Sequence, residues 1–169
     1  MWILEDIDPE MIKKFIGGIG LASKILFEET GPHVDPLSPQ NIVIVSSGLL
    51  NGTEAPTAYR SEITTKSPLT GIIGSGNIGG VFGSELRKAG YEAIILKGKA
   101  DDPVYLIIED DHIELKSAKH LWGKDTWETT DAIMERVGRD FSVMAIGQAG
   151  ENLVRVACPI IDYHHTPGR

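Results

Sequence analysis

The sequence has one cysteine, fewer basic than acidic side chains and no long apolar run. The single thiol, Cys158, excludes an internal disulfide framework and cannot hold a metal cluster alone, which favours a reducing cytoplasm. No apolar run approaches the roughly 18 residues of a membrane span. The first residues, MWILEDIDPE, are acidic where a signal peptide would be basic. We therefore expect a cytoplasmic protein that does not bind membranes.

The deficit of basic residues also limits the kind of partner. The chain has 16 lysines and arginines against 24 acidic residues, for a net charge of −8. Such a surface repels nucleic acids and anionic lipids, so any basic residue used for binding must act locally. The length predicts one domain, residues 1–169, because a chain of this size can bury roughly 68–70% of its unfolded surface.

Glycine, by contrast, is abundant and is concentrated in residues 60–83, RSEITTKSPLTGIIGSGNIGGVFG. Because glycine lacks a Cβ, this segment predicts a loop whose N–H groups bind phosphate, followed by a helix from about Val81. The letters GSGNIG satisfy the dinucleotide-binding expression G-x-G-x-x-G, but no hydrophobic strand precedes them and no acidic residue is convincingly placed after them. The Walker pattern is absent. The alternative interpretation is a glycine-rich turn between a strand and a helix.

Three polar residues in this segment are candidates for a ligand contact. Arg60 lies on an otherwise uncharged strand segment, 17 residues before Asn77, and its planar guanidinium suits a phosphate. Asn77 tolerates a left-handed backbone and can offer its carbonyl to a ligand or metal. Lys66 adds positive charge nearby. The alternatives are a strand-edge arginine paired with Glu62 or Glu54, a turn-forming asparagine and a solvated lysine.

Hydrophobic spacing predicts the remaining elements. Residues 9–30 have the spacing of one amphipathic helix, and its internal glycines at positions 17, 18 and 20 indicate close helix packing or a ligand edge. A capping box at Asp125 and Glu128 predicts a helix to about Val137. Strands are expected over residues 42–48, 59–65, 93–97, 104–109, 112–117, 142–147 and 153–161, with 104–117 as a hairpin.

This order of elements does not repeat a strand–helix–strand unit. It predicts an α+β fold with mixed or antiparallel sheets rather than a doubly wound parallel sheet. Residues 42–64 and 143–161 each pair a buried strand with a glycine- and asparagine-containing turn and a second strand that holds Arg60 or Arg155. This similarity suggests two related halves.

The histidines and tryptophans do not predict a second site. His164 and His165 are adjacent on an expected strand, so their side chains point to opposite faces and are better explained as surface residues than as ligands of one metal. Trp122 and Trp127 flank a helix start and are expected to be core or interface anchors. Residue chemistry alone therefore predicts a platform for a polar ligand without reactive groups of its own.

A set of motifs in fixed order resembles the N-terminal domain of the aldehyde ferredoxin oxidoreductase family. The motifs include FIGGIGLASKIL, TEAPTAYR, TTKSPLTG, GSGNIGG, HLWGKDTWETTDAI and AIGQAGENLVRVA. The likeness extends over nearly the whole chain from about residue 13. Members are tungsten or molybdenum enzymes with a bis-pterin cofactor, so the resemblance implies an α+β fold with two related sheet halves on which the pterins lie.

The resemblance also implies site residues. Arg60 in TAYR matches the family arginine that contacts pterin phosphate, and Asn77 matches the asparagine at the pterin and its bridging magnesium, which the backbone carbonyl would bind. Arg169 resembles the arginine of the second pterin-contact stretch. The implied cofactor contacts are Arg60, Gly76, Asn77, Ile78, Gly79 and Arg169.

Finally, the resemblance implies an enzyme that needs more than this chain. The family's [4Fe–4S] cluster and its acid/base residues belong to later domains, so the implied partners are a cluster-bearing C-terminal domain or subunit, an aldehyde and a ferredoxin-like electron acceptor. This chain would be a fragment or a small subunit. The implied reaction oxidises an aldehyde to a carboxylic acid, and a variant reduces a different carbonyl or an aromatic thioester. The alternative is a structural or binding module that keeps the fold without the metal.

Overall fold

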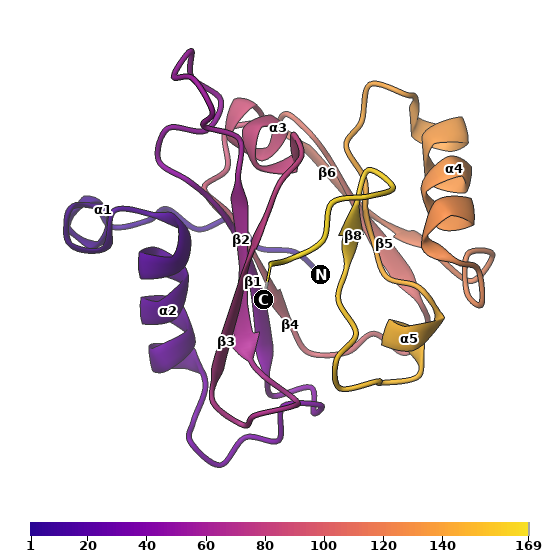
Figure 1. The fold of residues 1–169 in the computed structure, drawn as a ribbon, viewed down its shortest axis with the longest axis horizontal. Coiled ribbons are helices and arrows are strands. Elements are labelled where there is room, and N and C mark those ends of the chain that lie inside the picture. The colour runs from indigo at the N-terminus through magenta and orange to yellow at the C-terminus, as the bar shows by residue number, and fades with distance from the viewer. Residues whose placement is uncertain (169) are drawn as a thin grey trace.

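The computed structural model describes residues 1–168 and shows an α+β fold built on antiparallel sheets (Figure 1). The main sheet has the strand order β3-β2-β1-β4. Its strands are β1 (Ile42–Ser47), β2 (Ser61–Lys66), β3 (Ile73–Ile78) and β4 (Ala93–Lys97). Two small sheets pair β5 (Val104–Glu109) with β6 (His112–Ser117), and β7 (Met144–Ala145) with β8 (Ile160–Ile161). The predicted α+β class with antiparallel sheets is confirmed.

Helix α2 (Gly18–Glu29) covers one face of the main sheet (Figure 1). Its buried Ala22 and Leu26 form a hydrophobic core with Ile42 and Ile44 of β1. We call this side of the sheet the α2 face. Side chains alternate along a strand, so every second residue of β1 and β2 belongs to it.

The opposite face packs against the C-terminal part of the chain. Val45, Ile63 and Ile78 form a second core with Ile161 of β8, and Phe82 of α3 (Phe82–Lys88) packs against it. Both faces of the main sheet are therefore buried. This explains why β1 is a continuous run of aliphatic residues rather than an alternation of apolar and polar ones.

Several predicted elements are confirmed. Helix α4 (Thr126–Val137) begins with the expected capping box, in which Glu128 N donates to Asp125 Oδ1 at 2.8 Å and Asp125 N donates to the Glu128 carboxylate at 3.3 Å. The 104–117 hairpin is present as β5 and β6. Among the helices of the described residues, none is long and apolar enough to cross a membrane.

The single helix predicted over residues 9–30 is wrong. The segment forms two helices, α1 (Pro9–Phe15) and α2, because Ile16 and Gly17 adopt φ values of 69° and 131° that no α-helix contains. The turn is so tight that a Cβ at Gly20 would collide with the Phe15 carbonyl oxygen. The interior glycines thus mark a sharp break between helices.

The glycine-rich loop predicted before Val81 is also wrong. Most of it is the edge strand β3, which pairs with β2 in a register that sets Glu62 opposite Asn77. Glycine alternates with Ser75 and Asn77 along this strand, and the low strand propensity of glycine hides the alternation. The glycines serve packing: a Cβ at Gly76 would lie 2.6 Å from Pro167.

The strands predicted over 142–147 and 153–161 are mostly wrong. Only the two-residue strands β7 and β8 remain, the expected turn contains helix α5 (Gln148–Glu151), and the chain between α5 and β8 is irregular. The alternating Val154 and Val156 that suggested a strand are exposed, so burial does not enforce pairing. Arg155 lies in this irregular segment, and the predicted relation between two halves stays a prediction.

Candidate functional site

A cleft of about 300 Å³ opens where the break between α1 and α2 faces the ends of β1, β2 and β3. Hydrophobic and glycine residues supply one wall, and charged and polar residues supply the other. Its lining residues are Ile16, Gly17, Gly18, Ile19, Gly48, Leu49, Arg60, Ser61, Glu62 and Asn77. Two predicted site residues, Arg60 and Asn77, therefore lie in one cleft, together with two of the glycines for which a ligand edge was expected.

Arg60 and Asn77 are joined directly. The Arg60 guanidinium donates a hydrogen bond to Asn77 Oδ1 at 2.7 Å. Neither Glu54 nor Glu62 forms an ion pair with Arg60 within residues 1–168, so the expected alternative of a carboxylate-paired arginine is not found there. The exposed guanidinium keeps further N–H donors for an oxyanion.

Glu62 lies beneath this pair. Asn77 Nδ2 donates to Glu62 Oε2 at 3.1 Å, and Ser75 Oγ donates to Glu62 Oε1 at 2.5 Å. All three residues project from the α2 face because β2 and β3 pair Glu62 with Asn77 and Thr64 with Ser75. The cleft therefore contains one guanidinium and one carboxylate, linked through an amide.

The N-terminal end of α2 supplies the facing wall. Three consecutive residues, Ile16, Gly17 and Gly18, have φ values of 69°, 131° and 51°. No side chain caps this helix at Gly17. The first N–H groups of a helix lack partners within it and carry partial positive charge, so this wall attracts anions.

The other predicted contacts are not part of this cleft. The Ile78 side chain is fully buried in the core with Ile161, so it can meet a ligand only through its backbone. A Cβ at Gly79 would lie 3.3 Å from the His165 ring, and Gly76 faces Pro167. Arg169 lies outside the described residues. These contacts stay predictions, and packing against residues 165–168 already accounts for both glycines.

The predicted magnesium ligand is the backbone carbonyl of Asn77. This oxygen accepts a hydrogen bond from Gly168 N at 2.9 Å. A carbonyl oxygen has a second lone pair, so the prediction stands with one position still open. Among the residues that the structure describes, no group of three or more histidine, cysteine, aspartate or glutamate side chains could hold a metal ion.

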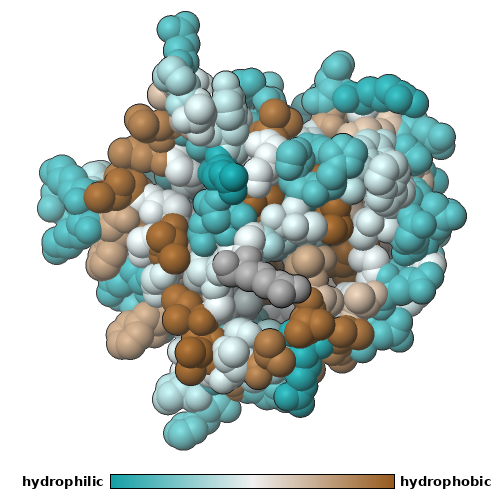
Figure 2. All heavy atoms as spheres, viewed as in Figure 1, coloured by the Kyte–Doolittle hydropathy of each residue, from teal (hydrophilic) through white to brown (hydrophobic). Residues whose placement is uncertain are grey.

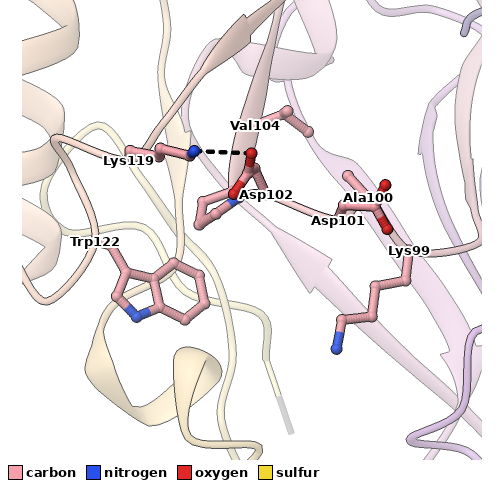
Figure 3. A pocket seen from close by; sticks show the side chains of 8 residues that line it. Lys99, Ala100, Asp101, Asp102, Val104, Lys119 and Trp122 are labelled. Atoms are coloured by element: carbon pink, nitrogen blue, oxygen red, sulfur yellow. Dashed lines mark ion pairs between the residues drawn. The ribbon is translucent and has the colours of Figure 1, made fainter.

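A larger cavity of about 650 Å³ lies between residues 99–104 and the segment that holds Lys119 and Trp122 (Figure 3). Lys119 Nζ is paired with Asp102 Oδ2 at 2.8 Å, and Lys99 and Asp101 balance each other in charge. The cavity shares no residue with the cleft and contains none of the predicted site residues. Its lining does not select a particular ligand.

The histidines belong to an aromatic cluster. Trp127 packs against Tyr163 and His164, with ring centroids 5.2 and 5.8 Å apart, and both adjacent histidines are exposed as expected. Tyr163 Oη donates to Asp131 Oδ1 at 2.7 Å, and this bond raises the pKa of Tyr163 above its ordinary value. Trp122 and Trp127 are more than half exposed, so neither is a core residue, and interface remains the other predicted role.

Sequence reasoning missed Glu62 and Ser75 as parts of the site. The period-two alternation of SEIT and SGNI would have placed Glu62, Ser75 and Asn77 on one face, had the glycine-rich segment been recognised as a strand. Glu62 was considered only as a direct partner of Arg60.

Comparison with known proteins gives consistent matches over nearly the whole chain. A family model described as aldehyde ferredoxin oxidoreductase, N-terminal domain, matches residues 1–169. A tungsten-containing aldehyde ferredoxin oxidoreductase of Pyrococcus furiosus is 49% identical over 167 residues, and one of Thermococcus kodakarensis is 46% identical over 167 residues. Each alignment covers 98% of this chain and 28% of the relative.

A solved structure matches the fold closely. It is the active site complex BamBC of benzoyl coenzyme A reductase in complex with 1,5-dienoyl-CoA, with a TM-score of 0.92 and 37% sequence identity. The match covers 96% of this chain and 25% of that chain. The present sequence thus spans about a quarter of the length of the proteins that it resembles.

Proposed function

The chain belongs to the aldehyde ferredoxin oxidoreductase family, and from this membership we propose that residues 1–169 are the pterin-cofactor-binding domain of a tungsten or molybdenum oxidoreductase. When bound, the bis-pterin metal centre supplies the two-electron oxidation of an aldehyde to a carboxylic acid, with electrons passing to an iron–sulfur cluster on another domain or chain. A ferredoxin-like protein is the proposed final acceptor.

One observation carries this proposal: the Arg60 guanidinium is held by Asn77 at the mouth of a cleft and has no carboxylate partner in the described part of the chain. A positioned guanidinium with open donors binds phosphate oxygens strongly. The uncapped N-terminal end of α2 opposite Arg60 favours negative charge at the same place. These residues fit the phosphate part of a pterin cofactor.

The fit is divided between side chains and backbone. Arg60 and the α2 end would bind phosphate, and Asn77 would orient Arg60 while its carbonyl contributes to a magnesium site. Among the described residues that line the cleft, Glu62 is the only acidic or histidine side chain, and both of its carboxylate oxygens are engaged. We therefore assign binding and orientation to this domain and the proton transfers to its partner.

The first prediction tests Arg60. The enzyme that carries this domain, purified anaerobically, should contain tungsten or molybdenum and pterin, and Arg60→Ala should lower both contents because each charge-assisted bond contributes about 1.5–3 kcal/mol. Arg60→Lys keeps the charge but loses the planar geometry and should recover only part of the content. Arg136→Ala, at an exposed arginine of α4, is the matched control.

Metal content and substrate preference can each change this assignment. A wild-type enzyme without metal and pterin would favour the structural or binding module. A second candidate function, reduction of an aromatic thioester, is favoured by the close match to the benzoyl coenzyme A reductase complex. Dye assays with aldehydes and with aromatic thioesters separate the two reactions, and the higher identity to the aldehyde enzymes favours the first.

A further inference from the structure

Glu62 is an unexpected residue in the cleft that we propose to bind phosphate. Its carboxylate lines the same cleft as Arg60 and carries a negative charge, which opposes the binding of phosphate. It forms no ion pair with lysine or arginine anywhere in residues 1–168 that would neutralise this charge. A carboxylate in this place therefore requires an explanation other than charge.

The hydrogen-bond chemistry supplies one. A carboxylate can only accept hydrogen bonds and a guanidinium can only donate them. The Asn77 amide lies between the two, so its NH2 group must face Glu62 and its oxygen must face Arg60, as the distances of 3.1 and 2.7 Å show. Without the carboxylate, the Asn77 NH2 group loses its acceptor and the amide is held only by its bond from Arg60.

The network is anchored in the core. Thr64 is fully buried, and its hydroxyl lies 2.9 Å from Ser75 Oγ. Because Ser75 donates its proton to Glu62 Oε1 at 2.5 Å, Thr64 must be the donor to Ser75. Both oxygens of Glu62 are thus held, one from the core side and one from the cleft side.

We propose that Glu62 is a positioning residue of the cofactor site: it fixes the Asn77 amide, and through it directs the open donors of Arg60 toward the phosphate. The inference rests on the proposed function, but it concerns a different residue and a different role. In this role Glu62 acts through Asn77 and not through contact with the cofactor. The Glu62 carboxylate repels an anion, but it also fixes the geometry of the Arg60 donors. Preorganised donors bind more strongly than mobile ones.

The test is a double-mutant cycle in the full-length enzyme, read out as tungsten and pterin per polypeptide and as the rate of tungsten loss to a chelator. We expect Glu62→Ala to speed this loss about tenfold, the effect of one charge-assisted hydrogen bond. In an Asn77→Ala background, the same change should have no further effect, because Glu62 acts through Asn77. Glu62→Gln keeps an acceptor for the amide and should fall between Glu62→Ala and wild type.

The matched control is Glu54→Ala, which removes an exposed carboxylate from the connection that leads to Arg60. It should leave the loss rate unchanged. Equal loss rates for wild type and Glu62→Ala, or equal effects of Glu62→Ala with and without Asn77, would overturn the positioning role while leaving the proposed function intact. A wild-type enzyme that contains neither tungsten, molybdenum nor pterin would overturn both.

Discussion

Arg60 and Tyr163 illustrate how single side chains in this domain are tied to polar partners rather than to opposite charges. Arg60 meets an amide at 2.7 Å, and the Tyr163 phenol meets the Asp131 carboxylate at 2.7 Å. In each case one proton fixes the geometry of an exposed or half-exposed group. These bonds have measurable consequences for titration and for ligand binding.

The second prediction concerns Tyr163. Its hydrogen bond to Asp131 raises the pKa of the phenol above the ordinary value of about 10. A phenol with a raised pKa is held neutral by the folded state, so its contribution to stability is complete below pH about 10 and is lost as pH rises through the higher folded value. Ultraviolet titration should show one late phenol, absent in Tyr163→Phe.

Asp131→Asn provides the control for the cause of this shift. The variant keeps a hydrogen-bond acceptor but removes the charge, so the pKa of Tyr163 should fall toward its ordinary value. An unchanged high-pH phase in this variant would show that the carboxylate is not responsible.

At this scale the sequence predicted that Arg60 and Asn77 lie close together, as they do, but not the Glu62 carboxylate that holds the Asn77 amide. Arg60 and Asn77 were expected at one site because glycine and arginine chemistry suits phosphate. Glu62 was missed as part of the site because its role depends on the cross-strand register of β2 and β3, which is a property of pairing and not of local composition.

The break between α1 and α2 is the element on which one wall of the cleft depends. Gly17 has φ 131° and ψ −172°, a region that is essentially restricted to glycine. A Cβ there would also lie 3.2 Å from Glu92 Oε1. Propensity rules placed a helix across this segment because the apolar spacing continues through it, and only the backbone conformation shows the break.

The third prediction follows from this conformation. Gly17→Ala should destabilise the domain by about 1–3 kcal/mol through backbone strain and should also lower cofactor content. Gly138→Ala is a matched control, since Gly138 has φ 112° and ψ 158° but no neighbour within 4 Å of its Cβ position and no place in the cleft. Thermal unfolding should shift in both variants, whereas cofactor content should fall in Gly17→Ala alone.

The fourth prediction concerns Gly79, which directly follows strand β3. Gly79→Val should block cofactor insertion if the glycine admits the pterin, yet its Cβ position also lies 3.3 Å from the His165 ring. A second change, His165→Ala, separates the two causes. We expect cofactor content to stay low in the double variant, while recovery of normal content would assign Gly79 to packing.

Across the whole molecule, many large hydrophobic side chains are exposed to solvent. Figure 2 shows hydrophobic side chains in several places on one face. Phe27 is 84% exposed, and Leu69, Ile72 and Val156 are also exposed. Exposed apolar groups of this extent are typical of surfaces that another protein surface covers. The proteins that this chain resembles are about four times longer, and we expect the part that corresponds to their remaining length to cover these side chains.

The last prediction is that this domain catalyses no reaction without that covering part. One cysteine cannot supply the thiolates of an iron–sulfur cluster, and in the described residues no metal-binding group of side chains replaces it. A metal centre bound at this exposed cleft would also be open to water, which an active site of this kind must exclude. The 169-residue chain alone should therefore show no aldehyde-dependent dye reduction, whereas the native enzyme should contain an iron-bearing domain or subunit and reduce the dye. Electrons that leave the metal centre must have a nearby acceptor, which we place on the covering part. Activity in the isolated chain, or a native enzyme that lacks iron, would therefore contradict the prediction that this domain needs an iron-bearing partner.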